Sequence, residues 1–236
     1  MTEALYLDAS DQQTFEATVS RHAGDRVVLD RTCFYPTGGG QPNDTGRLST
    51  GTDSWSVTDV QKKDTIYHTL EGKPPEPGTT VTGELDWDRR VAHMRYHTAQ
   101  HLLSAVLLEE FEAETTGNQL YADRARIDCA YERFDADTLG AIESRLNDLI
   151  DEDLPVDWYD MDRETAEAEL DPERTRLDLL PSSITEVRIV EIGEYDRTAC
   201  AGTHVQSTAE IGEARITGRE TKGSGEERVT FTLDAQ

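Results

Sequence analysis

The sequence has few basic residues, which would bind an anionic surface, and no long apolar run, which would cross a membrane. Only four of its 23 basic residues are lysines, against 48 acidic residues, so the formal net charge of the 236 residues is −25. No apolar run reaches the ~18 residues that a membrane-spanning helix needs. Residues 1–15 also lack the basic and apolar regions of a signal peptide. We therefore expect a cytoplasmic protein that does not bind membranes.

Cysteine is scarce as well. The three cysteines, Cys33, Cys129 and Cys200, are odd in number and widely spaced, which argues against a disulfide framework. Apolar residues make up only 36% of the chain, but aromatic and β-branched residues recur along its whole length and no long low-complexity tract interrupts them. A folded protein of one large or two modest domains is therefore expected.

The acidic residues are dispersed along the chain instead of forming a tail, which disfavours a tail that binds basic partners. Dispersed acids with few lysines indicate adaptation to a very salty cytoplasm, where salt screens the repulsion between like charges. An ordinary acidic protein with no such adaptation remains the alternative.

The first part of the chain has the pattern of closely spaced short strands. The expected strands are residues 25–32, 54–61, 65–70 and 80–87. Segments rich in Gly and Pro, residues 36–46 and 71–78, lie between them. Short strands without intervening helices are typical of a small barrel, so residues 1–88 are predicted to form a β-barrel domain.

The pattern changes at Asp88, a candidate helix N-cap. A helix is expected from Asp88 to about Phe111, and another over residues 136–154. The residues of the first helix that are expected to face the core are Val91, Met94, Ala99, Leu102 and Val106. The stripe in the second helix is Leu139, Ile142, Leu146, Leu149 and Ile150. Strands are expected at 125–132, 156–162, 187–193, 214–221 and 228–233. Residues 89–236 are thus predicted to be an α+β domain, with helices packed on an antiparallel sheet.

Two short pairs of histidine and cysteine residues suggest a metal site. His97 and His101 stand at i and i+4 on the first helix, which puts both imidazoles on one face. Cys200 and His204 flank an Ala-Gly-Thr turn in a predicted loop between strands. Three imidazoles and one thiolate favour zinc over magnesium or calcium. A buried free thiol and a surface histidine remain the alternatives for the second pair, because the site exists only if the fold joins the pairs.

Three motifs carry a resemblance to a known family. The run from Arg95 to Leu103, with the sequence RYHTAQHLL, resembles the histidine motif in the editing domain of alanyl-tRNA synthetases. CAGTH at 200–204 is similar to the second motif of that domain, and FYPTGGGQPNDTG at 34–46 resembles the glycine-rich motif of the preceding barrel. Because no aminoacylation domain precedes them, the chain resembles the freestanding AlaX editing proteins of medium length.

The resemblance implies both fold and activity. It implies a barrel like those of translation factors, followed by the α+β domain shared with threonyl-tRNA synthetase. The implied zinc ligands are His97, His101, Cys200 and His204. The implied reaction is hydrolysis of the ester that joins wrongly attached serine to tRNA(Ala). In it, zinc either activates water or only positions the substrate. Glycine as a second substrate and the oligomeric state stay open.

Substrate contacts are also implied by the resemblance. In AlaX proteins a threonine near this position hydrogen-bonds the hydroxyl of bound serine, and alignment favours Thr116, while a slip of one residue selects Thr115. A turn or strand threonine is the plainer interpretation. Gly38, Gly39 and Gly40 either bring backbone N–H groups to a phosphate or ribose of the tRNA or simply form a turn.

Three other functions share part of this pattern. A zinc peptidase is disfavoured because Thr98 stands where the HExxH motif needs its glutamate. A non-catalytic zinc-containing tRNA-binding module and hydrolysis of Ser-tRNA(Thr) remain alternatives. His93, one turn before His97, is expected to point away from the metal and to lie on the helix surface, because each step of four residues drifts about 40° around the helix.

Overall fold

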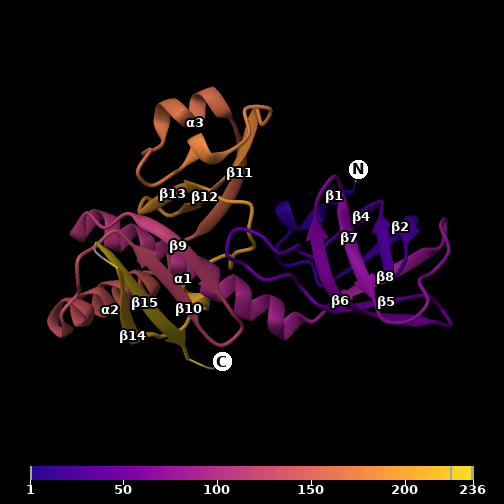
Figure 1. Ribbon diagram of the computed structural model, residues 1–236, viewed down its shortest axis with the longest axis horizontal. Helices are drawn as coiled ribbons and strands as arrows, with labels where there is room; N and C mark the ends of the chain where they lie inside the picture. Colours follow the sequence, from indigo (N-terminus) through magenta and orange to yellow (C-terminus); the bar gives the residue numbers. More distant parts are fainter. Residues whose placement is uncertain (1, 224, 235–236) are drawn as a thin grey trace. The chain divides into compact units, whose positions relative to one another are not determined.

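The chain changes from short strands to long helices where the sequence predicts it (Figure 1). The structure, a computed structural model, describes residues 2–223 and 225–234. It divides into two units, residues 1–93 and 94–236, within the helix α1 (Trp87–Phe111). The predicted boundary after residue 88 lies at the start of that helix. None of the described helices is long and apolar enough to cross a membrane.

Strands of the first unit form a barrel. Its elements are β1 (Glu3–Ala4), η1 (Leu5–Leu7), β2 (Thr14–Ala23), β3 (Arg26–Leu29), β4 (Arg31–Thr32), β5 (Gly46–Ser49), β6 (Ser54–Lys62), β7 (Ile66–Leu70) and β8 (Thr80–Leu85). Six of the described strands close the barrel in the order β2-β3-β7-β6-β5-β8, and β1 pairs with β4 outside it. The predicted small barrel is confirmed, while its likeness to translation factors stays a prediction.

The barrel core follows from alternation along the strands. In β8, Val81, Gly83 and Leu85 are buried while the residues between them are exposed. Gly83 leaves room for the ring of Phe15, since a Cβ there would lie 2.3 Å from a ring carbon. Phe15 in turn packs edge-on against Phe34, with ring centroids 5.7 Å apart. The core therefore depends on a small residue opposite an aromatic one.

The helix α1 starts one residue before the predicted N-cap. The backbone N–H of Arg89 donates to Oδ1 of Asp86 at 3.4 Å, and that of Arg90 donates to the main-chain oxygen of Asp86 at 3.0 Å. Asp86 therefore caps the helix, and the assignment of Asp88 as N-cap was wrong. Asp88 lies in the first turn, where its negative charge still suits the helix dipole.

The second unit holds the rest of the helices and strands. They are β9 (Thr115–Leu120), β10 (Ala125–Cys129), α2 (Ala136–Asp151), β11 (Val156–Asp162), α3 (Arg163–Glu169), η2 (Leu177–Leu179), β12 (Glu186–Ile192), β13 (Asp196–Ala199), η3 (Thr208–Glu210), β14 (Ala214–Gly223) and β15 (Glu226–Leu233). The helix and strand regions expected from the sequence are present, and β9, β13 and α3 are additions.

These strands form two antiparallel sheets where one was expected. One sheet has the order β14-β15-β10-β9, and the other has the order β11-β12-β13. The separation arises because β12 pairs with β11 and β13, while the chain leaves β13 through a loop before it enters β14. That loop contains Cys200 and His204.

Both long helices pack on the larger sheet. Tyr96 of α1 lies against Phe231 of β15, with ring centroids 5.9 Å apart, and Asn147 of α2 exchanges two 2.8 Å hydrogen bonds with the backbone of Ala214 in β14. The predicted inward residues are buried except Val91 and Leu139, which are half-buried. This packing fixes the helix face that carries the two histidines.

Candidate metal centre

Two histidines of the second unit lie one helical turn apart on α1. His97 and His101 are 3% and 7% exposed, and their ring centroids are 5.3 Å apart. Every residue from 93 to 107 is buried, so tight packing limits the rotamers that the two rings can adopt. The spacing thus places both imidazoles on one face of the helix.

Cys200 and His204 come from the loop that follows β13. The backbone N–H of Cys200 donates to the main-chain oxygen of Arg188 in β12 at 3.0 Å. The guanidinium of Arg188 reaches back to the loop, and its Nη1 donates to the main-chain oxygens of Cys200 and Gly202 at 2.8 and 3.1 Å. The same guanidinium lies over the ring of Trp158, 5.2 Å from its centroid. One arginine therefore holds the turn between the two candidate ligands.

The two pairs meet at one point. Ligand-capable atoms of His97, His101, Cys200 and His204 all lie within 4.8 Å of one another. The Sγ atom of Cys200 is 3.5 Å from Nε2 of His97 and 3.4 Å from Nε2 of His204. Tetrahedral zinc, with bonds of ~2.0–2.1 Å to nitrogen and ~2.3 Å to sulfur, separates such atoms by about 3.5 Å. The donor set and its spacing therefore fit zinc.

The ionisation of two members of the cluster, Cys200 and His204, suits a metal ion. Burial opposes ionisation of the Cys200 thiol, but the three imidazoles beside it outweigh burial and hold the pKa of Cys200 well below its usual value. Burial, reinforced by His97, lowers the pKa of His204 to about 3, which keeps that imidazole neutral. Thiolates and neutral imidazoles are the forms that bind zinc.

Thr98 determines which ring nitrogen of His204 faces the cluster. Its Oγ1 donates to the main-chain oxygen of Met94 at 2.9 Å and accepts from the backbone N–H of Val205 at 3.3 Å. Nδ1 of His204 lies 3.3 Å from the same oxygen. Because the hydroxyl proton already has an acceptor, the hydroxyl accepts the proton of Nδ1, which leaves the lone pair of Nε2 for a metal ion.

Known proteins resemble the chain over its whole length. Residues 2–89 match the family described as tRNA synthetases class II (A), and residues 187–230 match the threonyl and alanyl tRNA synthetase second additional domain. The alanyl-tRNA editing protein AlaX-M of Methanosarcina barkeri is 43% identical over 241 residues, with 99% of both chains covered. The AlaX-M protein of Saccharolobus solfataricus is 38% identical over 238 residues, again with 99% of both chains covered. The chain belongs to the AlaX-M family of alanyl-tRNA editing proteins.

Alanine–tRNA ligases contain a segment that is similar to nearly the whole chain. The ligase of Pyrococcus abyssi is 38% identical over 235 residues, which cover 98% of this chain and 26% of the ligase. The resemblance to AlaX proteins and to the editing domain of alanyl-tRNA synthetases, deduced from the three motifs, is therefore confirmed.

The two candidate threonines of the AlaX-M chain point in opposite directions from β9. Thr116 is exposed, and its hydroxyl donates to Oε1 of Glu226 at 2.8 Å. Thr115 is half-buried, and its hydroxyl lies 2.6 Å from Oγ of Ser104 on α1. Ser104 is one turn beyond His101, so Thr115 faces the helix that carries the histidine pair, whereas Thr116 does not.

The glycine-rich motif forms a defined turn in the first unit. Gly38 and Gln41 exchange backbone hydrogen bonds of 3.1 and 2.9 Å, and Gly39 and Gly40 between them have positive φ values of 56° and 79°. A side chain is disfavoured at such φ values, which explains glycine there. The hydroxyl of Tyr35 donates to the main-chain oxygen of Gly38 at 3.0 Å, which restrains the turn further.

His93 was expected on the helix surface, and this was wrong. Its side chain is fully buried, because α1 is covered on all sides in this stretch and has no solvent-facing side. His93 does not belong to the group of four ligand-capable residues found among the described residues.

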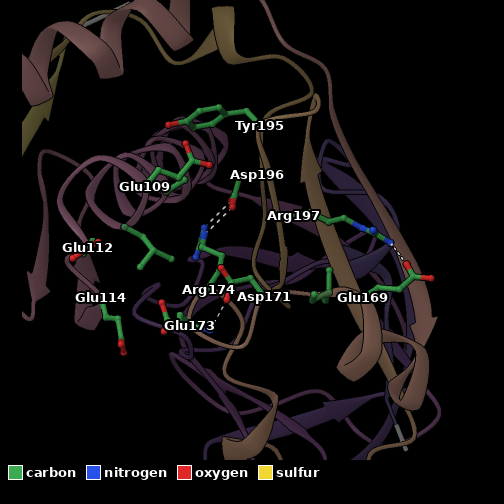
Figure 2. Close-up of a pocket in the computed structure, with 13 residues that line it drawn as sticks. Glu109, Glu112, Glu114, Glu169, Asp171, Glu173, Arg174, Tyr195, Asp196 and Arg197 are labelled. Carbon is green, nitrogen blue, oxygen red and sulfur yellow. Dashed lines mark hydrogen bonds and ion pairs between the residues drawn. The ribbon is translucent and has the colours of Figure 1, made fainter.

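Three supporting residues were missed by sequence reasoning: Arg188, Asp196 and Arg174. Asp196 stands four residues before Cys200, and an acid so close to a ligand motif was a usable signal. Asp196 and Arg174 line a hollow of about 640 Å³ whose other labelled side chains are mostly acidic (Figure 2). Asp196 connects the hollow with the metal cluster, because Oδ2 of Asp196 lies 3.3 Å from Nδ1 of His101.

Proposed function

We propose that this protein hydrolyses the ester between serine and the terminal adenosine of tRNA(Ala), with one zinc ion as cofactor. The ligands of that ion are His97, His101, Cys200 and His204. The observation that carries the proposal is the convergence of these four residues, from a helix and a distant loop, with ligand-capable atoms within 4.8 Å of one another. The names of the AlaX-M relatives support the substrate class.

The chemistry follows from the charge that such a site supplies. Zinc bound here contributes a positive charge that polarises the ester carbonyl or orients the attacking water. Four protein ligands complete a tetrahedral site, so a direct role in the reaction needs a fifth position or a displaced ligand. Cys200 is half-buried while the three histidines are buried, which supports an approach of the ester from the side of Cys200.

Selection of serine over alanine requires a partner for one hydroxyl group. The sequence favours Thr116, but that side chain lies on the exposed face of the strand, where its hydroxyl donates to Glu226 and not toward α1. We assign the contact to Thr115, whose hydroxyl lies beside Ser104, one turn along α1 from His101. A site built to hydrogen-bond a hydroxyl disfavours a substrate without one, because its polar group is then left unpaired.

Residues 1–88 are proposed to contribute to tRNA selection. The turn at Gly38, Gly39 and Gly40 exposes backbone at least in part, which suits a contact with a ribose or phosphate. Editing of aminoacyl-tRNA accompanies translation, so the proposed place of action is the cytoplasm. The excess of 48 acidic over 23 basic residues supports function at high salt, where local hydrogen bonds and stacking contribute more than phosphate attraction.

The first test measures zinc and substrate range together. The purified protein should contain one zinc per chain, and Cys200→Ala should lose it, whereas Cys129→Ala, at a buried cysteine outside the cluster, should retain it. Undiminished zinc in Cys200→Ala would overturn the ligand set. Deacylation is then compared for Ser-tRNA(Ala), Gly-tRNA(Ala) and Ser-tRNA(Thr). Zinc without hydrolysis of any of them would indicate a non-catalytic tRNA-binding module, and preference for Ser-tRNA(Thr) would change the substrate.

A further inference from the structure

The imidazole of His101 has a charged group behind it. Its Nδ1 lies 3.3 Å from Oδ2 of Asp196, whose side chain is only 2% exposed. Nδ1 is buried and forms no hydrogen bond of regular geometry in the described part of the chain, and the carboxylate of Asp196 is the acceptor at closest range to it. Asp196 is therefore the acceptor available to the proton of Nδ1, and Nε2 is left to face Cys200 and the other histidines.

Arg174 holds this carboxylate in place. Its Nε and Nη2 donate to Oδ1 and Oδ2 of Asp196 at 2.7 Å each, and Figure 2 shows the two side chains facing each other. Nη2 also donates to the main-chain oxygen of His101 at 3.3 Å. One guanidinium thus contacts both the carboxylate and the backbone of the ligand that the carboxylate faces. Such a forked pair restricts geometry more than a single contact does.

The segment that carries Arg174 is itself tied to β13. The backbone N–H groups of Arg174 and Thr175 donate to the main-chain oxygen of Asp171 at 3.1 and 2.7 Å. The hydroxyl of Thr198 in β13 donates to the main-chain oxygen of Arg174 at 3.3 Å and lies 2.8 Å from the hydroxyl of Thr175. Asp196 and Thr198, two residues apart in β13, are therefore both tied to this turn, which orients the guanidinium of Arg174 toward Asp196.

We infer that Asp196, held by Arg174, is a positioning residue that fixes the ring of His101 and raises the affinity of the cluster for zinc. The inference rests on the proposed function. A metal-binding histidine commonly donates its second ring N–H to such a partner, and loss of the partner lowers metal affinity by about 10–100-fold. Nδ1 of His204 contacts the uncharged hydroxyl of Thr98. Nδ1 of His101 instead contacts the negatively charged carboxylate of Asp196.

The test compares zinc affinity in Asp196→Asn and the wild-type protein. Competition against a chromophoric chelator should show affinity lower by about 10–100-fold in Asp196→Asn. The matched control is Asp178→Asn, because Asp178 forms a similar fork with Arg176, at 3.0 Å to each oxygen, in an exposed pair outside the cluster. The control should bind zinc as the wild type does. Equal affinity in Asp196→Asn and wild type would overturn the inference.

A second readout distinguishes a positioning role from a general loss of structure. Nitrogen-15 NMR of the histidine rings should show His101 protonated at Nδ1 in the wild type and a mixture of tautomers in Asp196→Asn. If Asp196→Asn fails to fold, Arg174→Lys tests the same point, because it keeps the charge and removes the fork. An affinity equal to wild type in Arg174→Lys would then contradict the role of the fork. If the wild type itself binds no zinc, the proposed function fails rather than this inference alone.

Discussion

The hydroxyl oxygen of Thr98 lies 3.3 Å from Nδ1 of His204. Thr98 belongs to the same helix as His97, whereas His204 comes from the loop beyond β13, so the contact joins the two halves of the metal cluster. Thr98 occupies the place of the glutamate in a zinc peptidase motif, and here its short side chain orients a ligand and carries no charge.

Removal of this hydroxyl should weaken zinc binding. Thr98→Val keeps the branched shape but leaves the N–H groups of His204 and Val205 without their acceptor, so zinc affinity should fall by about 10–100-fold. Thr98→Ser keeps the hydroxyl and should stay within a few-fold of wild type. Chelator competition gives both values, and a Val variant that binds zinc as tightly as the wild type would refute the role of Thr98.

Serine discrimination should depend on Thr115. A neutral hydrogen bond contributes about 0.5–1.5 kcal/mol, so Thr115→Val should lower the ratio of Ser-tRNA(Ala) to Ala-tRNA(Ala) deacylation by a few-fold to about tenfold. Thr116→Val should leave the ratio unchanged. Because Thr115 also contacts Ser104, Ser104→Ala shows how much of the effect is indirect. A change with Thr116→Val alone would restore the assignment made from the sequence.

The stability of the barrel should depend on a buried ion pair. Asp44 and Arg90 both have fully buried side chains, and Nε of Arg90 lies 3.2 Å from each carboxylate oxygen. Asp44→Asn leaves the guanidinium charge without its partner and should cost about 3–5 kcal/mol in the free energy of unfolding. Glu3→Gln, in an exposed pair with Arg31, should cost less than about 1 kcal/mol. Urea unfolding measures both, and similar costs would contradict the prediction.

Acid should destabilise the barrel through His68. Burial lowers the pKa of His68 from 6.5 to about 4, so between these values the unfolded chain binds a proton that the folded barrel does not. Stability is therefore lost as pH falls from about 7 to 4, by about 3 kcal/mol. In His68→Gln the loss of unfolding free energy between pH 7.5 and 4.5 should be smaller than in wild type. Equal losses in the two proteins would show that His68 does not contribute.

High salt should stabilise the whole chain. With a net charge of −25, like charges repel in the folded state, and the Debye length falls from about 10 Å at 0.1 M salt to about 3 Å at 1 M. The melting temperature should therefore rise as KCl increases over this range. A flat or falling curve would support the alternative of an ordinary acidic protein.

Local patterns made part of the site predictable. The spacing within HTAQH and CAGTH indicated two candidate ligand pairs, because a helical turn and a glycine turn each bring residues four apart together. The stripe Ile142, Leu146 and Leu149 identified one face of α2, since that helix has one side toward the sheet and one toward solvent.

The rest depends on contacts that no local pattern records. Arg174 is 73 residues from His101 in sequence, and nothing in its own segment marks it as a partner of Asp196. The surface assignment of His93 failed because residues 93–107 of α1 are buried all round, so the polar residues of this stretch are not confined to an exposed side. Gln100 illustrates this, being 2% exposed with its side chain donating to the main-chain oxygen of Arg126 in β10.

The central claim is that zinc in this cluster is required to remove serine from tRNA(Ala). Deacylation of Ser-tRNA(Ala) and Ala-tRNA(Ala) should be measured side by side at high KCl, before chelation, after chelation and after zinc is restored. The account predicts faster hydrolysis of Ser-tRNA(Ala), its loss on chelation and its recovery with zinc. Serine hydrolysis that persists undiminished in metal-free protein would contradict it.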